Sequence, residues 1–347
     1  MKLLKFPFLI QEEILKQMKY SVIVLLSFLS RPMRQLVEQC KLDIPRLQYE
    51  ADDDMFYVGI NWNTGDIDTL IAIQETPHFD SLEVVKIRMG DDFEMQTRFG
   101  TYKREDQKIE PVMYVREITP LMQRSLQQYI NSIFRYSSFN EFRANLDECS
   151  FKLPNIVDIR DSLFDGSKVD IEVIERFFTI HSNHRSTHIR PTIIGKMSDN
   201  SRLFDIKNIS LGNQNGSDFL RKFTGQNLIL HDTILDTSDI VEFLKNWNSG
   251  ISYQNLESIS ISLAKGLQFE TGTILKTLET KEYDSQNPEE RRDDHYHDIK
   301  IFSYIPKTLS FRYHMYLEVE RKTDGIKAYI ICEDNEFHLI VPKVSVG

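Results

Sequence analysis

The sequence has few cysteines and lacks the short motifs of common enzymes. Cys40, Cys149 and Cys332 are odd in number and far apart, which excludes a disulfide framework and a Cys-x-x-Cys metal site. No Gly-x-Gly-x-x-Gly, Walker A, Gly-x-Ser-x-Gly or His-Glu-x-x-His pattern occurs. We therefore expect a reducing compartment and a non-enzymatic protein with no catalytic residue, no cofactor and no metal.

Excess positive charge and long apolar runs are also absent. Lys and Arg number 42 against 52 Asp and Glu, a net charge of -10, which argues against a nucleic-acid partner. The apolar run Val22–Leu29 is far shorter than the roughly 20 residues of a spanning helix. Lys5 and Pro7 interrupt the first ten residues, unlike a signal peptide. These features predict a folded protein of the cytoplasm or nucleus with no membrane segment.

The N-terminal stretch Phe6–Leu36 has the pattern of three short helices. Pro7 suits the first turn of a helix because its missing amide hydrogen would be unpaired there. Ser21 is a good N-cap for the apolar run that follows. The first helix has one apolar face, formed by Ile10, Ile14 and Leu15. A helical layer this small cannot bury its apolar surface alone, so a partner or the rest of the chain must cover it.

This stretch resembles an F-box. The residues on the family pattern are Phe6, Pro7, Ile10, Ile14, Leu15, Leu25, Leu26, Ser30, Arg31 and Leu36. The chain departs from the pattern at Leu9, Lys19 and Met33. The resemblance implies a substrate-recognition subunit of an SCF-type cullin-RING E3 ubiquitin ligase, docked on a Skp-family adaptor and through it on a cullin. The implied adaptor-binding residues are Phe6, Pro7, Ile10, Ile14, Leu15, Leu25, Leu26 and Leu29.

A second hypothesis keeps the same helices but removes the adaptor. The helices would pack onto the chain's own sheet as a vestigial F-box, and the protein would be a non-catalytic interaction module with no ligase role. A metal enzyme or hydrolase built around histidines ranks well below both hypotheses.

After a joint at Cys40–Asp54, which contains Pro45 and ends in an acidic patch, the pattern changes to strands and then to helices. Alternating apolar residues predict strands over 56–62, 67–73, 82–89 and 111–118, the first two forming a hairpin. Thr119 and Pro120 begin a helix as N-cap and first residue, and a second helix starts near Val169.

Residues 223–263 read as strand, helix and strand. Asn227–His231 and Leu256–Leu263 are the strands, and two strands joined by a helix imply a parallel pair. Asp205–Gly212 adds a strand to the same sheet, which predicts an irregular, leucine-rich-repeat-like sheet.

This region resembles the F-box-associated type 2 domain of a nematode-expanded family. The resemblance rests on Leu-Ile-Leu-His-Asp from Leu228, Phe-Leu-Lys-Asn-Trp from Phe243, Leu-Glu-Ser-Ile-Ser-Ile from Leu256, and a closing hairpin turned at Thr323–Gly325. It implies that the C-terminal domain presents an unknown protein target. We expect an α+β chain with an F-box at 1–45, a strand-rich then helical region at 46–198 and the associated domain at 199–347.

Isolated polar and aromatic residues have simpler interpretations. His181, His184 and His188 have metal-ligand spacing, but their neighbours favour a solvated loop. His231 and Asp232 are adjacent on a strand, so their side chains point to opposite faces and cannot form a dyad. Trp247 is expected in the core.

Overall fold

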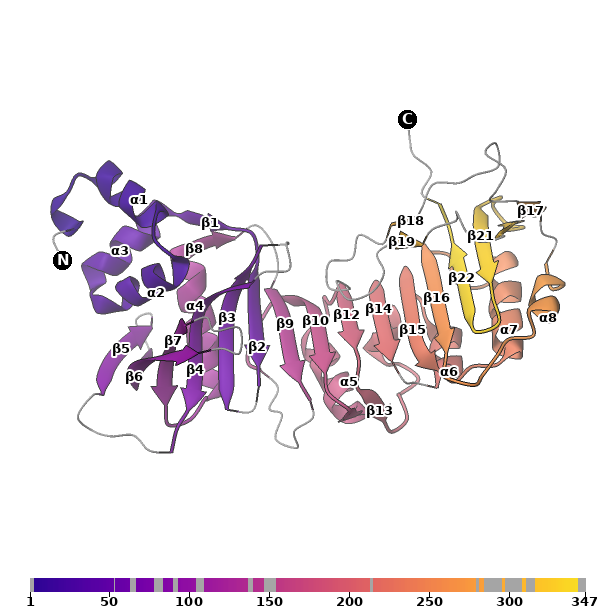
Figure 1. Ribbon diagram of the computed structural model, residues 1–347, viewed down its shortest axis with the longest axis horizontal. Coiled ribbons are helices and arrows are strands. Elements are labelled where there is room, and N and C mark those ends of the chain that lie inside the picture. The colour runs from indigo at the N-terminus through magenta and orange to yellow at the C-terminus, as the bar shows by residue number, and fades with distance from the viewer. Residues whose placement is uncertain are drawn as a thin grey trace. The chain divides into compact units, whose positions relative to one another are not determined.

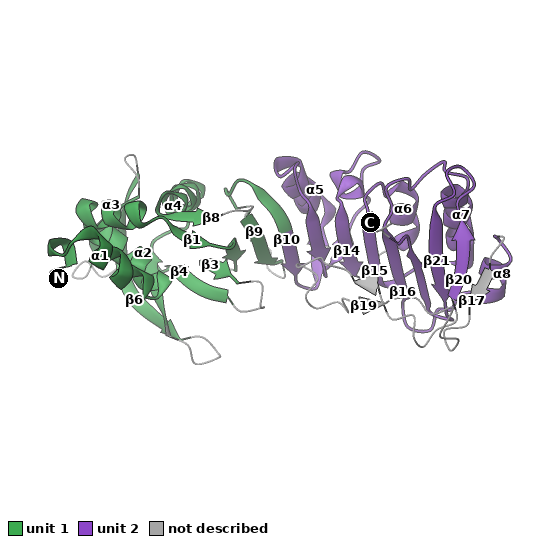
Figure 2. Ribbon diagram, turned by 90° about the horizontal axis from the view of Figure 1, so that it is seen from above, with its two compact units in different colours: residues 1–161 green, residues 162–347 purple. Residues whose placement is uncertain are grey.

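The computed structural model of the protein describes residues 3–52, 54–62, 67–77, 84–89, 93–103, 109–136, 140–146, 154–212, 215–278, 281–283, 295–296, 308–309 and 316–342. The fold is mixed α+β, as expected, and the chain divides into two compact units, 1–161 and 162–347 (Figures 1 and 2). The expected segments at 1–45, 46–198 and 199–347 do not coincide with these units, because the N-terminal helices share a unit with the strands that follow them.

The first unit contains an N-terminal helical layer and a mixed sheet. Its described helices are η1 (Leu3–Lys5), α1 (Phe8–Lys16), α2 (Tyr20–Leu29), α3 (Arg31–Cys40) and α4 (Pro120–Ile133). Its strands are β1 (Leu42–Ile44), β2 (Leu47–Ala51), β3 (Met55–Asn61), β4 (Ile67–Glu75), β5 (Val85–Met89), β6 (Phe93–Lys103), β7 (Ile109–Val115), β8 (Phe134–Tyr136) and β9 (Asn140–Asn145). The strand order is β9-β2-β3-β4-β7-β6-β5, while β1 pairs separately with β8.

Several expectations about this unit are confirmed. Strands β3 and β4 form the antiparallel hairpin, and β5 and β7 fall on predicted strands. Thr119 caps α4 by accepting a hydrogen bond from the Met122 amide, and Pro120 is its first residue. The hairpin turn predicted at 63–66 lies outside the described residues. The helix boundary at α2 was misplaced, since Lys19 and not Ser21 is its N-cap.

Five strands of the first unit were missed. Strands β1 and β2 occupy the stretch assigned to a joint, and β6 occupies the polar connection between two predicted strands. Strand β8 lies at the end of the helix predicted from Pro120, and β9 lies in the loop expected after it. In β6 the exposed and half-buried residues alternate almost throughout, so its sequence is nearly as polar as a loop. Strand pairing, rather than apolar periodicity, holds these segments in the sheet.

The N-terminal helices pack onto the sheet and onto α4. The Phe28 ring of α2 stacks on the Tyr129 ring of α4 at 4.8 Å and lies 6.4 Å from the Phe99 ring of β6. The Tyr129 hydroxyl donates to Ser27 Oγ at 2.8 Å, and both groups are buried. The inner face of α2 is thus covered by the chain itself.

The second unit combines parallel and antiparallel strands. Strand β10 (Ile159–Asp165) crosses the boundary between the units. The described helices of the second unit are α5 (Ile171–Ile180), η2 (Arg202–Asp205), α6 (Gly216–Lys222), α7 (Thr237–Asn248) and α8 (Thr271–Leu275). Its strands are β11 (Lys168–Asp170), β12 (Ser186–Ile189), β13 (Thr192–Ile194), β14 (Asn208–Gly212), β15 (Asn227–Thr233), β16 (Ser258–Leu263), β17 (Lys281–Tyr283), β18 (His295–Tyr296), β19 (Thr308–Leu309), β20 (Tyr316–Glu320), β21 (Lys327–Cys332) and β22 (Glu336–Ile340).

Three of the parallel strands of the second unit, β14, β15 and β16, were correctly predicted, whereas β12 lies in a stretch expected to be a solvated loop. Strands β12, β14, β15 and β16 run parallel in that order, with α7 between β15 and β16. Strands β22, β21, β20 and β17 continue the sheet antiparallel, and the predicted turn at Thr323–Gly325 joins β20 to β21. Trp247 on α7 is fully buried, which confirms its place in the core.

Candidate docking surface on the N-terminal helices

The chain entering α1 is held in a defined turn. Pro7 is the N-cap residue, and its fixed φ of -55° fits the helix start. The Gln11 side chain is buried and donates to the Phe6 carbonyl at 2.7 Å. The Phe6 amide donates to the Leu3 carbonyl at 3.0 Å. These bonds fix the path of the residues before α1, where Leu3 is buried and the side chains of Leu4 and Phe6 stay on the outside.

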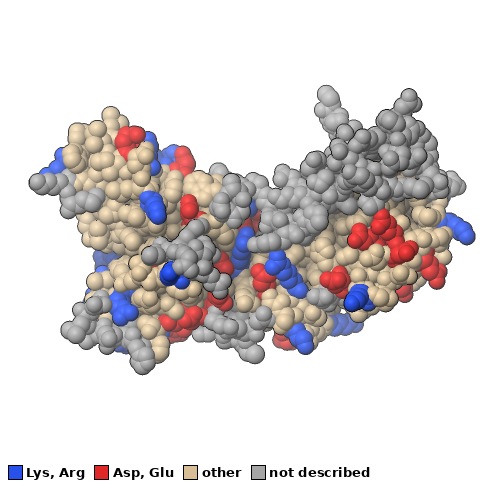
Figure 3. Space-filling view, in the orientation of Figure 1, with Lys and Arg blue, Asp and Glu red and all other residues tan. Residues whose placement is uncertain are grey.

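Large apolar side chains are exposed along this turn and the first turn of α1. We call them the α1 patch, and with their exposed fractions they are Leu4 44%, Phe6 50%, Phe8 42%, Leu9 71% and Ile10 48%. The charged side chains of α1 pair among themselves one turn later, where Lys16 Nζ lies 2.9 Å from Glu12 and 3.1 Å from Glu13. In Figure 3 the surface over the N-terminal helices is largely uncharged. Exposed apolar clusters of this kind mark interaction sites.

The exposure does not come from loose packing of the helices. Leu15 of α1, Ile23 and Val24 of α2, and Val37 of α3 are each at most 1% exposed. Ser30 caps α3 by accepting a hydrogen bond from the Met33 amide at 3.3 Å. The helical layer is well packed inside, and the α1 patch is what remains outside.

The eight adaptor-binding residues implied by the F-box resemblance differ in how far they are exposed. Phe6, Pro7 and Ile10 are exposed beside one another, and Leu29 is exposed at the end of α2 with 73% of its surface in solvent. Ile14, Leu25 and Leu26 are half-buried. Leu15 is fully buried, so its side chain stabilises the helical layer and does not reach a partner in this conformation.

Some exposed residues were not among those eight. Phe8 and Leu9 belong to the α1 patch, and Val22 of α2 is 40% exposed. Leu9 had been noted only as a departure from the family pattern. Helical spacing relative to Leu15 places Leu9 away from the buried side, and this signal alone would have included it, whereas Phe8 lies seven residues before Leu15 on the same side and its exposure could not be read from spacing.

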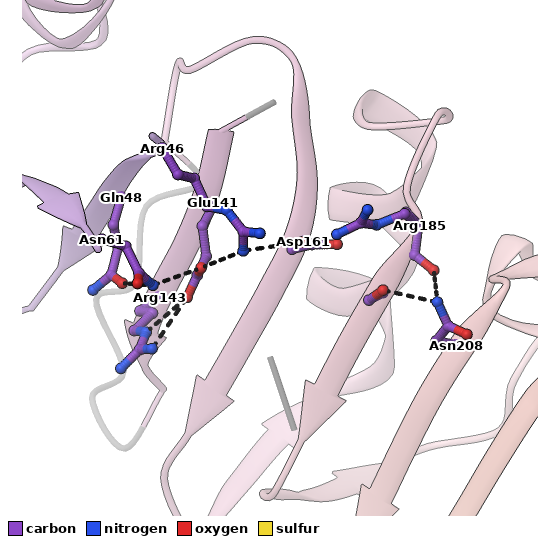
Figure 4. Close-up of polar contacts among 9 residues, drawn as sticks. Arg46, Gln48, Asn61, Glu141, Arg143, Asp161, Arg185 and Asn208 are labelled. Atoms are coloured by element: carbon purple, nitrogen blue, oxygen red, sulfur yellow. Dashed lines mark hydrogen bonds and ion pairs between the residues drawn. The ribbon is translucent and has the colours of Figure 1, made fainter. Parts of the chain in front are cut away.

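Buried charged side chains of the first unit form a network (Figure 4). The Arg46 Nη1 atom lies 3.3 Å from Glu141 and 3.6 Å from Asp161, and the three side chains are at most 7% exposed. Arg143 Nε donates to Glu141 at 3.1 Å, and Asn61 Nδ2 donates to the same carboxylate at 3.1 Å. Buried charges need such compensation. The network joins Arg46, the residue before β2, to β3, β9 and β10 and has a structural role.

The histidines of the second unit are not in a solvated loop, contrary to expectation. His181 and His188 are each 6% exposed, and His188 lies on β12. His184 packs edge-on against the Phe178 ring at 4.8 Å, and its Nε2 lies 2.8 Å from Ser162 Oγ. Burial by the aromatic residues of α5 overrides the polar composition of the segment. Ser162 is fully buried, so this Ser-His pair cannot meet a substrate.

The other weighed sites are structural. Asp232 has a φ of 49° where the register between β15 and β16 shifts, so it marks an irregularity at the strand end. Among the described residues, no three His, Cys, Asp or Glu side chains are grouped to hold a metal ion.

No described helix combines the length and apolar character needed to cross a membrane. Comparison with known proteins adds no relative: no family model matches the sequence, and no significant match was found among curated proteins or solved structures. The chain is thus placed by its own features, as an α+β protein with an exposed apolar patch on its N-terminal helices.

Proposed function

We propose that this protein is a substrate-recognition subunit of an SCF-type cullin-RING E3 ubiquitin ligase, whose N-terminal helices dock on a Skp-family adaptor. The observation that carries the proposal is the α1 patch, which stays exposed on an otherwise well-packed helical layer. Phe6, Pro7 and Ile10 of the F-box pattern lie in or beside it. The same proposal describes the second unit as an F-box-associated domain with a leucine-rich-repeat-like sheet.

In this role the protein performs no chemistry. It holds a target near a conjugating enzyme bound elsewhere on the ligase, which raises the local concentration of the target lysine. The adaptor side of the protein therefore needs a stable apolar contact and no catalytic group.

The test is co-expression of the full chain with a Skp-family adaptor, followed by size-exclusion chromatography. Ile10→Glu places a charge in the α1 patch without touching the buried face of α1, whereas Ile14 is half-buried and its replacement would also disturb packing. We expect Ile10→Glu to weaken the complex at least about 30-fold, since a central interface residue contributes about 2 kcal/mol or more.

The matched control is Ile251→Glu, the same substitution at an isoleucine of the second unit that is 74% exposed. It should co-elute with the adaptor like the wild type. A well-folded wild type that forms no complex, or an Ile10→Glu variant that co-elutes unchanged, would contradict adaptor docking.

The alternative function is a non-catalytic interaction module with a vestigial F-box. It is favoured by the packing of α2 on β4 and α4, which shows that the helical layer belongs to the core of the first unit and is not a detachable module. Under this alternative the α1 patch binds another protein, and the adaptor experiment gives no complex.

A further inference from the structure

Strand β5 lies at the outer end of the sheet of the first unit (Figure 1). The strand order ends there, with β6 as the neighbour on one side. On the other side, alternate amide and carbonyl groups of β5 meet no described strand. An edge of this kind can pair with an extended segment of another chain, because each such amide and carbonyl is a donor or acceptor for one more strand.

The edge of β5 lacks two features that block strand addition in other sheets. Its five residues contain no proline. They pair with β6 from Val85–Thr97 to Met89–Phe93 without a register shift, so the strand has no bulge. Prolines and bulges at an edge remove donors or bend the strand away from a partner. Strand β5 is therefore a regular template for one more strand.

One side of β5 is apolar. Phe99 on β6 faces α2, where its ring lies 6.4 Å from the Phe28 ring. The register of the two strands puts Val85, Ile87 and Met89 on the same side as Phe99. Ile87 and Met89 are at most 4% exposed, whereas Val85 is 44% exposed. A strand added to β5 is therefore favoured when its side chains on this side are apolar.

The opposite side of β5 carries two cations. Lys86 and Arg88 are exposed there, with Arg98 of β6 on the same side. Lys86 Nζ lies 3.3 Å from Glu94 in an exposed pair, and Arg88 forms no ion pair with a described residue. Pairing of two such edges would bring like charges together, which disfavours a second copy of this chain as the occupant. Carboxylates two residues apart on an added strand would meet both cations.

We propose that the outer edge of β5 binds an extended segment of another protein in which apolar and acidic residues alternate. Backbone hydrogen bonds to β5 supply affinity, and the alternating side chains supply specificity. The apolar residues of the segment lie on the side of Ile87, and the acidic residues lie beside Lys86 and Arg88. The proposal rests on the proposed function only in taking that protein to be the target of recognition.

The test compares two fluorescein-labelled peptides of equal composition, each titrated with the full-length protein by fluorescence polarisation. The first has the order Lys-Val-Glu-Val-Glu-Val-Lys, and in the second every Lys and Glu is exchanged. Acidic residues also flank β5 in the sequence, at Glu83, Asp91 and Asp92, and the chain carries a net charge of -10. Because the peptides have the same net charge, only the order of their charges is compared. We expect the first peptide to bind at least about fivefold more tightly.

Two N-methylated forms of the first peptide test pairing through the backbone. One form is methylated on its three valines and the other on its two glutamates. Amides along a strand point alternately toward and away from the neighbouring strand, so the two sets of amides face opposite ways. We expect one form to bind at least about tenfold more weakly and the other to stay within about threefold of the first peptide. Equal losses in both forms, or no loss in either, would overturn strand addition.

Charge reversal on β5 tests the side chains that read the segment. Lys86→Glu with Arg88→Glu should reverse the preference, so that the second peptide binds more tightly than the first. The control is Lys168→Glu with Lys265→Glu, which makes the same change at exposed positions of the second unit and should keep the wild-type preference. A preference that the β5 pair leaves unchanged, or that the control pair also reverses, would contradict the proposal.

The adaptor experiment distinguishes this failure from failure of the proposed function. The β5 and control variants should co-elute with the adaptor like the wild type, since none of them touches the α1 patch. A stable dimer of the wild type that excludes the first peptide would assign the edge to a second copy and overturn the proposal. Circular dichroism of each variant confirms that it is folded before binding is compared.

Discussion

At the scale of the residue, His188 makes the stability of the second unit depend on pH. Burial, and then the charges of Arg190 and His231, lower the pKa of His188 from 6.5 to about 3. Between these values the unfolded chain binds a proton that the folded chain does not, so stability falls as pH is lowered through this window. The loss reaches about 1.4 kcal/mol per pH unit at most.

The variant His188→Gln isolates this effect. We expect the urea midpoint of the wild type to fall between about pH 6.5 and pH 4, and that of the variant to fall less steeply over the same range. The comparison uses the slope of the urea midpoint against pH. A loss of stability in the variant that is the same at every pH therefore does not affect the result. Identical slopes would show that His188 is protonated without unfolding.

At the scale of the element, a ladder of polar side chains joins the parallel strands. Asn227 donates to Asn208 Oδ1 at 2.9 Å and accepts from Ser258 Oγ at 2.6 Å, and Asn208 donates to Ser186 Oγ at 3.0 Å. These four buried residues occupy one register position on β12, β14, β15 and β16. The ladder satisfies polar groups that would otherwise oppose burial of this end of the sheet.

Replacing Asn227 breaks the centre of the ladder. Asn227→Ala should destabilise the second unit by about 2–3 kcal/mol, because buried groups of Asn208 and Ser258 lose their partner. In a Trp62→Phe background, Trp247 alone reports unfolding of this unit in urea. Asn255→Ala, at an exposed asparagine, is the control and should change stability by at most about 0.5 kcal/mol. A loss of stability no larger than that of the control variant would mean that the ladder makes no net contribution to the stability of the second unit.

At the scale of the whole molecule, the N-terminal helices are part of the fold of the first unit. A truncated chain that begins at Pro45 lacks the Phe28 ring that stacks on Tyr129 and the Ser27 partner of its hydroxyl. Both of these contacts are buried or half-buried in the intact chain. We expect the truncated chain to lose soluble yield and to be cleaved within residues 46–161 by limited proteolysis, relative to the full chain.

A detachable F-box would leave a well-folded remainder after this truncation, which would then separate the two functional hypotheses. The packing of α2 makes the two hypotheses predict the same outcome, so the Ile10→Glu variant replaces it as the deciding experiment. A truncated chain that stayed monodisperse and resistant to protease would show that the first unit folds without its helical layer.

The elements that could be read from the sequence are those with strong local signals. The β3–β4 hairpin, the Thr119 cap of α4 and the parallel pair β15–β16 follow from alternation, capping and the strand-helix-strand order. Strand β6 and the buried His188 could not be read in this way, because pairing with β7 holds β6 in the sheet and pairing with β14 places His188 inside it.

The sequence by itself determined where α1–α3 lie and that their apolar side chains need a cover, because periodicity and capping act within a few residues. Only the tertiary structure decided which of those side chains the protein covers itself. Leu15 faces the helical layer and is buried, whereas Leu9 and Ile10 remain 71% and 48% exposed. Burial is set by what packs against a side chain, and that neighbour is supplied by the whole fold.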